Sequence, residues 1–327
     1  MVPVSDEKPL ACWAGKDRIG KEVLPSLTVI FRTGGCAWSG CLMCGYRSVR
    51  MEGPAGRLAE RIQAQLSWVR LHSPPASYEV IKIYTSGSFL DPCEVPPAAR
   101  DAVGDAFRGK VVIAETRPEF ITPEVLGGFT ARVDDGSRAV PCYVAIGLET
   151  TDDGIREKCI RKGFTFADYL RAARTARDAG AGVKAYLLQK PPFLTERESV
   201  GDMARSLAAL PGHADLVSLN PCTVQSGTAV ERLWQRGAYR PPYLWSVLTV
   251  LEGAPMHVTC DPVGGGYPRG PHNCGRCDRE LLAGIRDYSL SGDRGLLRAL
   301  LRQECGCREE WELVMERERP YALPLTR

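Results

Sequence analysis

Short apolar runs recur along the chain, and each of them is followed by polar or glycine residues. Six such runs, rich in β-branched side chains, cover residues 27–32, 80–84, 110–114, 143–148, 183–188 and 216–219. Runs of this length and composition are typical of buried strands. Segments between them carry apolar residues at helical spacing, as residues 57–71 and 168–179 do. The pattern therefore predicts strands that alternate with helices.

An alternation of strands and helices predicts parallel βαβ units and an α/β fold. Six units in succession favour a barrel, whose active face is formed by the residues just after each strand. An open, doubly wound sheet is the structural alternative.

The composition of the sequence changes near residue 253, which predicts a domain boundary there. Residues 256–278 are rich in glycine, proline and cysteine, and two helical segments and a charged stretch follow them. We expect a lead-in with little structure of its own over residues 1–24, a barrel core over 25–253, and a small cysteine-containing C-terminal extension over 254–327.

Composition and charge bear on whether the protein binds nucleic acid, spans a membrane or is secreted. The 327 residues carry a formal net charge of +3, which permits a nucleic-acid partner without favouring one. No apolar run is long enough for a transmembrane helix, and the first residues do not read as a secretory signal. We therefore expect a cytoplasmic protein with no membrane contact. Because disulfides are disfavoured in that compartment, the closely spaced members of the 13 cysteines are interpreted as metal or cluster ligands.

The first cysteine group is Cys36, Cys41 and Cys44, three thiols within nine residues on a glycine-bearing loop. Three thiolates can hold three irons of a [4Fe–4S] cluster and leave the fourth iron open. A structural zinc site would need a fourth ligand close by. A redox dithiol of Cys41 and Cys44 would leave Cys36 without a role. The spacing favours the cluster, and zinc is the alternative.

The second cysteine group lies in the C-terminal extension. Cys274 and Cys277 are separated by two residues, Cys260 precedes them, and Cys305 and Cys307 lie further along the sequence. Such spacing is typical of zinc sites. We expect Cys260, Cys274 and Cys277 to bind zinc or a second cluster, and a loop with free thiols is the alternative.

The residues around Cys36 resemble the radical S-adenosylmethionine (SAM) superfamily, although four residues separate the first two cysteines where three are usual. Each further matching position also has a structural interpretation. Met43 can fill the core, Ser86-Gly87-Ser88 can form a turn, Glu149 can form a salt bridge, and Arg161 can be a helix-end charge. The resemblance implies SAM contacts at Met43, Ser86, Gly87, Ser88, Glu149 and Arg161.

Longer stretches resemble one branch of that superfamily. Residues 114–122 and 147–149 are similar to the branch that includes the elongator catalytic subunit. The stretches that are similar to the radical SAM subunit of archaeosine synthase are residues 31–46, 84–91 and 270–277. This resemblance adds Tyr46 and Glu115 to the implied cofactor site.

The resemblance implies a radical SAM partial TIM barrel and a lyase that modifies tRNA. In that family a partner subunit attaches lysine to a deazaguanine base in the D-arm, and the radical SAM subunit cleaves the lysine C–N bond to give archaeosine. The implied cofactors are a [4Fe–4S] cluster and SAM, with zinc as a further candidate. The implied partners are tRNA, the lysine-transferring subunit and an electron donor.

Two alternatives stay open, and no catalytic residue is assigned. One is a radical SAM enzyme that acts on a small molecule. The other is a zinc-stabilised nucleic-acid-binding protein without catalysis.

Overall fold

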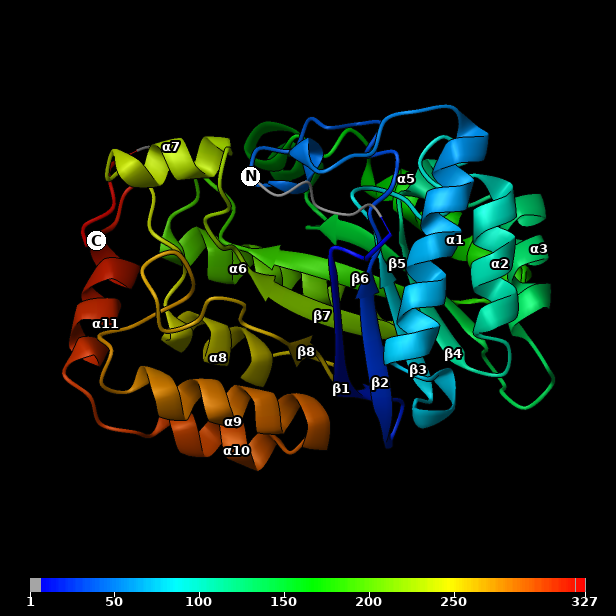
Figure 1. Ribbon diagram of the computed structural model, residues 1–327. Helices are drawn as coiled ribbons and strands as arrows, with labels where there is room; N and C mark the ends of the chain where they lie inside the picture. Colours follow the sequence, from blue (N-terminus) through cyan, green and yellow to red (C-terminus); the bar gives the residue numbers. More distant parts are fainter. Residues whose placement is uncertain (1–6, 321, 327) are drawn as a thin grey trace. The chain divides into compact units, whose positions relative to one another are not determined.

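A computed structural model of the protein describes residues 7–320 and 322–326. Strands and helices alternate along these residues, as the ribbon in Figure 1 shows. The strands are β1 (Ala11–Ile19), β2 (Glu22–Ile30), β3 (Val80–Tyr84), β4 (Val111–Thr116), β5 (Cys142–Glu149), β6 (Gly182–Gln189), β7 (Leu216–Pro221) and β8 (Thr259–Cys260). The predicted apolar runs coincide with β2 to β7, which confirms these strands.

The helices occupy the segments between the strands and the C-terminal part of the protein. The longer ones are α1 (Ala55–His72), α2 (Pro97–Ala106), α3 (Pro123–Val133), α5 (Phe166–Asp178), α6 (Glu196–Ala208), α7 (Ala229–Gln235), α8 (Leu244–Glu252), α9 (Asp278–Ser291), α10 (Arg294–Leu301) and α11 (Cys307–Arg317). Leu58, Ile62, Leu66 and Val69 are buried along one face of α1, as their spacing predicts. A capping box of Thr195 and Glu198 begins α6.

The strands follow one another in the sheet in sequence order, from β1 to β8. β1 and β2 pair antiparallel, whereas β2 to β5 pair parallel and β8 pairs parallel with β7. A doubly wound sheet reverses its strand order at a switch point, and this order has no reversal. The strand order confirms the expected α/β fold of the partial-barrel type.

The N-terminal hairpin corrects the expected lead-in. Residues 11–24 are not irregular, because β1 and the start of β2 form an antiparallel pair. Gly20, with a φ of 59°, lies in the tight turn between them, where a positive φ suits a two-residue hairpin. The centre of β1 is exposed, and Ile19 is the only β-branched residue of the strand, so β1 lacks the β-branched run that marks the other strands. The first six residues of the expected lead-in lie outside the described residues.

The first of two compact units comprises Met1–Ser39, Tyr46–Gly147 and Ala167–Lys184. Within it α1 packs on α2, and α2 packs on α3 (Figure 1). Phe89 and Phe129 meet edge to face in this packing, with ring centroids 5.1 Å apart. The C-terminal half of β2 and most of β3 and β4 are buried, as is typical of parallel strands covered by helices.

The second compact unit comprises Gly40–Gly45, Leu148–Phe166 and Ala185–Arg327. Within it α8, α9 and α10 pack against one another (Figure 1). The two units interleave along the sequence, and the domain bounds expected at residues 24 and 253 stay a prediction. Among the described residues, no helix combines the length and the apolar character that a membrane crossing requires.

Candidate functional site

The loop after β2 carries the first cysteine of the predicted cluster. Cys36 is half-buried. Its Sγ accepts the backbone N–H of Ser39 at 3.5 Å, and its carbonyl oxygen accepts the Ser39 hydroxyl at 2.7 Å. These two contacts with Ser39 fix the turn that follows Cys36.

The loop after β3 passes directly against Cys36. A Cβ added to Gly87 would lie 2.6 Å from the Cβ and 2.8 Å from the Sγ of Cys36. Non-bonded atoms do not approach this closely, so only glycine fits here. The stretch Ser86-Gly87-Ser88 that the sequence indicated therefore lies beside the first cysteine. At Gly87 the Cys36 side chain therefore packs directly against backbone.

Glu94 ties these two loops together. Its buried carboxylate accepts the Thr33 hydroxyl at 2.7 Å, the Gly87 N–H at 2.9 Å and the Ser88 N–H at 2.6 Å. Burial raises the pKa of Glu94, and the hydrogen bonds that it accepts oppose this shift. Sequence reasoning missed Glu94, because a lone glutamate in a loop has no spacing pattern that would identify it.

Arg117 connects the end of β4 with the same loops. Its backbone N–H donates to the Ser88 hydroxyl at 3.1 Å, and its guanidinium lies 5.3 Å from the centre of the Trp38 ring. Glu119 neutralises the buried guanidinium at 2.5 Å. The ends of β2, β3 and β4 thus share one polar network, as expected for the carboxyl edge of a parallel sheet.

Cys41 and Cys44 belong to the second unit and are half-buried. The backbone between them is anchored on both sides. The N–H of Leu42 donates to the carbonyl of Ile160 at 2.9 Å, and its carbonyl accepts the N–H of Ala229 at 3.0 Å.

Met43 packs against a buried apolar cluster of the second unit. The cluster includes Ile160, Leu188, Val224 and Val230. This contact matches the core-packing interpretation of Met43, and its role toward the SAM adenine stays a prediction.

Glu149 closes β5 in an unusual backbone conformation. Its φ is 68°, in the left-handed region that non-glycine residues rarely adopt. The residue is 7% exposed, and Lys162 Nζ lies 2.6 Å from its Oε1. Strained residues persist where the surroundings hold them, and they cluster at functional sites. Lys162 is a basic partner of Glu149 that sequence reasoning did not assign to the site.

Buried Arg156 holds the turn after Glu149. Its guanidinium donates to the carbonyl oxygens of Leu148, at 3.1 Å, and Thr150, and it pairs with Asp153. The Thr150 hydroxyl donates to Asp202 Oδ1 at 2.8 Å. Burial raises the pKa of Asp202 to about 6, and the hydrogen bond from Thr150 opposes the shift.

The remaining predicted cofactor residues lie in or next to these elements. Tyr46 begins a single 3-10 turn, Tyr46–Ser48, after the cysteine loop. Glu115 lies in β4 opposite Ala145 of β5. Arg161 is exposed and follows the π-helical turn Arg156–Ile160 with a φ of 62°.

The predicted residues fall into two sets. The first unit brings together Cys36 with Ser86, Gly87 and Ser88. The second unit contains the other two cysteines of the predicted cluster, together with Met43, Glu149 and Arg161. Their joint role in one site stays a prediction.

Four cysteines of the C-terminal extension lie together. The Sγ atoms of Cys274, Cys277, Cys305 and Cys307 are all within 4.8 Å of one another. Cys277 immediately precedes α9, and Cys307 is the first residue of α11. The sulfur–sulfur contacts of 3.4 to 3.9 Å are far longer than a disulfide bond of about 2.0 Å. The group is a complete set of soft ligands for a metal ion.

These thiols differ in acidity. Partial burial alone would raise the pKa of Cys274, but the backbone N–H groups of Arg276 and Cys277 lower it to about 6. Burial raises the pKa of Cys277 and raises that of Cys307 to about 11. A bound cation would favour the thiolate at every position.

The structure differs from the expectation at Cys260. This residue does not join the group of four. It lies in β8, where its N–H and carbonyl both bond to the Ser289 hydroxyl of α9, at 2.9 and 3.0 Å. Burial raises the pKa of its thiol. Cys305 and Cys307 complete the group, and the signal for them was the Cys-x-Cys spacing further along the sequence.

Comparisons with known proteins extend over most of the sequence. No protein-family model matches it. Methylornithine synthase shares 17% identity at a TM-score of 0.49, covering 69% of this protein and 61% of that one. The archaeal Elp3 of Methanocaldococcus infernus shares 15% identity at a TM-score of 0.48, covering 71% and 59%.

Two curated relatives are more similar in sequence. An archaeosine synthase subunit beta from Methanosarcina acetivorans is 40% identical over an alignment of 329 residues, which spans 97% of the present sequence and 92% of that protein. A second archaeosine synthase subunit beta, from Thermococcus kodakarensis, is 33% identical over 93% of the present sequence and 96% of its own length.

Proposed function

The chain belongs to the family of archaeosine synthase subunit beta, and from this premise we propose that it is a radical SAM lyase of tRNA modification. Its substrate is a lysine–deazaguanine adduct in the D-arm of tRNA. Cleavage of the C–N bond of the attached lysine leaves the amidine of archaeosine. The observation that carries the proposal is the similarity to these subunits over nearly the whole sequence.

The first cysteine group suits the cluster that this reaction needs. When bound, the [4Fe–4S] cluster and SAM supply a carbon-centred radical that removes an unactivated hydrogen atom, which amino-acid residues alone cannot do. Cys36, Cys41 and Cys44 hold three irons in this proposal. Gly87 lets the loop after β3 pack directly against Cys36, and Glu94 fixes the loops that carry both residues.

The protein's own polar groups bind and orient SAM in this proposal. Glu149 is a buried carboxylate already paired with a lysine, so it can accept hydrogen bonds from SAM without an unpaired charge. The backbone of the loop after β3 approaches the cysteine closely enough to contact the methionine part of SAM. The residues that we assign to SAM are Met43, Tyr46, Ser86, Gly87, Ser88, Glu115, Glu149 and Arg161.

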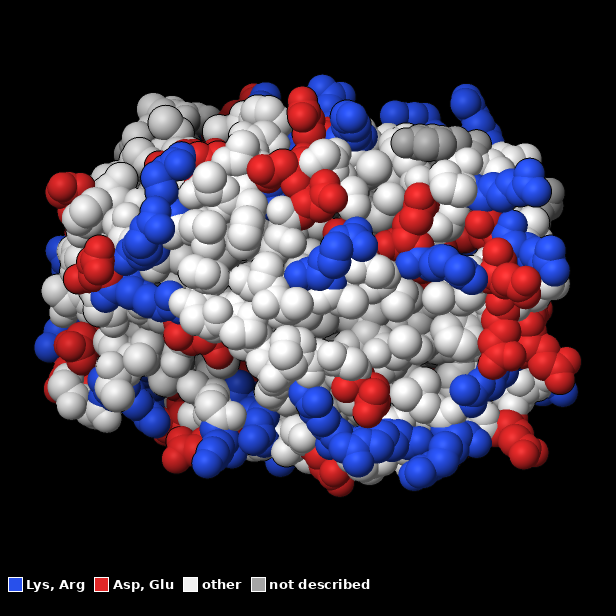
Figure 2. All heavy atoms as spheres, turned by 180° about the vertical axis from the view of Figure 1, so that it is seen from behind, with Lys and Arg blue, Asp and Glu red and all other residues white. Residues whose placement is uncertain are grey.

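The proposed partners are tRNA, the lysine-transferring subunit of archaeosine synthase and an electron donor. Figure 2 shows one face of the molecule, on which Lys and Arg residues lie among Asp and Glu residues with uncharged areas between them. Such a mixed surface offers phosphate contacts locally and leaves uncharged area for a protein partner. We also propose a cytoplasmic location, where tRNA is modified.

Anaerobic purification tests the proposed function. The wild type and the triple variant Cys36→Ala/Cys41→Ala/Cys44→Ala are analysed for iron and sulfide, then treated with dithionite and SAM. We expect about four irons per protein molecule in the wild type and none at this site in the variant. 5′-deoxyadenosine should form only with the wild type, and archaeosine only with lysine-bearing tRNA.

The other outcomes point to the alternatives. Deoxyadenosine formation by the wild type with no archaeosine formed on lysine-bearing tRNA would favour a radical SAM enzyme for a small molecule. Zinc in place of iron at this group would overturn the radical assignment and favour a binding protein without catalysis.

A further inference from the structure

The four sulfur atoms of the C-terminal extension are spaced for a single ion. A tetrahedral ion with metal–sulfur bonds of about 2.3 Å holds its sulfurs about 3.8 Å apart. Four of the sulfur pairs are 3.4, 3.6, 3.6 and 3.9 Å apart. In a [4Fe–4S] cluster the four thiolates bind different irons, so they lie further apart than two ligands of one ion can. The spacing selects one tetrahedral ion over a second cluster.

Donors and helix ends around the sulfurs favour four thiolates. The indole N–H of buried Trp245 donates to Cys307 Sγ at 3.4 Å, and the Asn273 amide donates to Cys277 Sγ at 3.4 Å. Cys277 and Cys307 also lie at the N-terminal ends of α9 and α11, where the helix dipole stabilises negative charge. Such outer partners orient metal ligands and offset the charge of four thiolates.

We propose that Cys274, Cys277, Cys305 and Cys307 bind one zinc ion, which holds the N-terminal ends of α9 and α11 against α8. Zinc binds thiolates well above ferrous iron in the Irving–Williams order. With four protein ligands its coordination is complete, so the ion has no open position for a substrate. Its role is structural.

The route from the ion to α8 is explicit. Asn273 donates to a zinc ligand with its amide nitrogen and accepts the N–H of Leu244, the first residue of α8, at 2.9 Å. Trp245, which donates to Cys307, is the next residue of the same helix. Both ligand-bearing helix ends are thus fixed to the first turn of α8.

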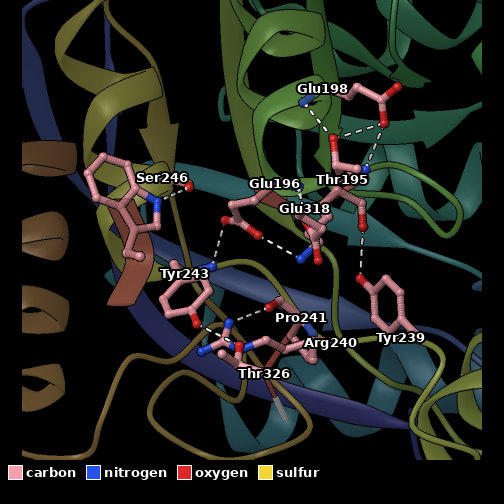
Figure 3. Close-up of polar contacts among 12 residues, drawn as sticks. Thr195, Glu196, Glu198, Tyr239, Arg240, Pro241, Tyr243, Ser246, Glu318 and Thr326 are labelled. Atoms are coloured by element: carbon pink, nitrogen blue, oxygen red, sulfur yellow. Dashed lines mark hydrogen bonds and ion pairs between the residues drawn. The ribbon is translucent and has the colours of Figure 1, made fainter. Parts of the chain in front are cut away.

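Contacts of α11 continue from there toward the end of β6. Trp311 of α11 donates to the Ser246 hydroxyl at 2.8 Å, and the Tyr243 hydroxyl donates to Glu310 at 2.7 Å. The Tyr243 N–H donates to Glu196 Oε1 at 2.9 Å, as Figure 3 shows. Glu196 in turn pairs with Lys190, the residue that follows β6. Loss of the ion should therefore loosen α11 first.

Metal analysis of full-length protein tests the ligand set. The background is the triple alanine variant at residues 36, 41 and 44, because any remaining metal then belongs to the second group. We expect about one zinc per protein molecule in this background, its loss on adding Cys305→Ser, and its retention on adding Cys260→Ala. Retention of zinc by the variant with Cys305→Ser, together with its loss from the variant with Cys260→Ala, would overturn the proposed ligand set. Iron as the bound metal, or no metal, would overturn the zinc assignment.

Two further measurements keep the test decisive if Cys305→Ser fails to fold. Zinc-edge X-ray absorption of the triple variant should show four sulfur ligands at about 2.3 Å, and a nitrogen or oxygen ligand would contradict the site. Hydrogen exchange of Cys307–Arg317 should accelerate after zinc is chelated, while that of Ala55–His72 stays unchanged. Unchanged hydrogen exchange of Cys307–Arg317 after chelation would overturn the structural role of the ion. Because the triple variant lacks the first cysteine group, these results are independent of radical activity.

Discussion

Replacing Gly87 with alanine tests whether the loop after β3 lies against Cys36. The new Cβ would lie 2.6 Å from the Cβ and 2.7 Å from the Cα of Cys36, so the backbone as well as the thiol must move. Gly87 has no positive φ, and the penalty is therefore purely steric. Overpacking of this kind costs about 1–3 kcal/mol, and the lower entropy of unfolded alanine offsets about 0.4–1 kcal/mol of it. We expect a net loss of about 1–2 kcal/mol in the free energy of unfolding.

The assay is urea unfolding of the wild type, Gly87→Ala and Gly127→Ala, with m-values compared to confirm that the transition is the same. Gly127 lies inside α3, and a Cβ added there meets nothing within 4 Å. Alanine is the better helix former by about 1 kcal/mol, so this control should be more stable than the wild type.

A wild-type free energy of unfolding in Gly87→Ala would refute the close approach to Cys36. Iron content gives a second reading. The displaced loop should also lower the iron bound by anaerobically prepared Gly87→Ala, whereas Gly127→Ala keeps the wild-type amount. Destabilisation with full iron content would separate the contact from the proposed cluster.

Three further substitutions, with Arg50→Met as a control, give additional tests. Glu94→Gln loses one of three accepted hydrogen bonds and turns an amide toward a backbone donor. Chemical unfolding at neutral pH should therefore show a free energy of unfolding lower by about 1–3 kcal/mol. An unchanged free energy of unfolding would contradict the network. Burial raises the pKa of Asp202 from 3.8 to about 6, so its folded form keeps a proton that the unfolded protein releases, and stability should fall as pH rises across this window. The Asp202→Asn variant should lack this fall and should be more stable than the wild type at pH 8 by up to about 3 kcal/mol. Curves of stability against pH that run parallel for the variant and the wild type would refute this. Lys190→Met leaves the fully buried Glu196 unpaired and should cost about 3–5 kcal/mol, whereas Arg50→Met in an exposed ion pair should cost less than about 1 kcal/mol in the same thermal or urea assay.

The strands were predictable because they are buried on both faces. All eight residues of β5 and all eight of β6 are buried, which selects a nearly continuous apolar run, interrupted in β6 by the buried Lys184, that the sequence displays directly. β1 was not predictable in this way. It lies at one end of the strand order with an exposed centre, and Ile19 is its only β-branched residue, so its pairing with β2 left no buried β-branched run in the sequence.

The candidate site was predictable where its residues follow strands and only partly where folding joins distant segments. The cysteine loop and the loop after β3 both follow apolar runs, and the structure places Gly87 against Cys36. Glu94 acts through the backbone of these loops, and no residue type or spacing reports such a contact. Cys305 joins Cys274 only because α9 and α10 pack against each other, whereas Cys260 is closer in sequence and lies elsewhere.

The two cysteine groups differ in coordination, and on our proposals that difference separates stability from chemistry. Four thiolates around one ion complete its coordination, so loss of Cys305 should cost zinc and the order of α11 while the cluster keeps its iron. Three thiolates on a four-iron cluster leave one iron free, so loss of Cys36 should abolish deoxyadenosine formation while zinc stays bound. Opposite effects on the two metals are expected because no thiol is shared between the groups. A variant at either group that lost both metals would instead require that one group depend on the other for its fold.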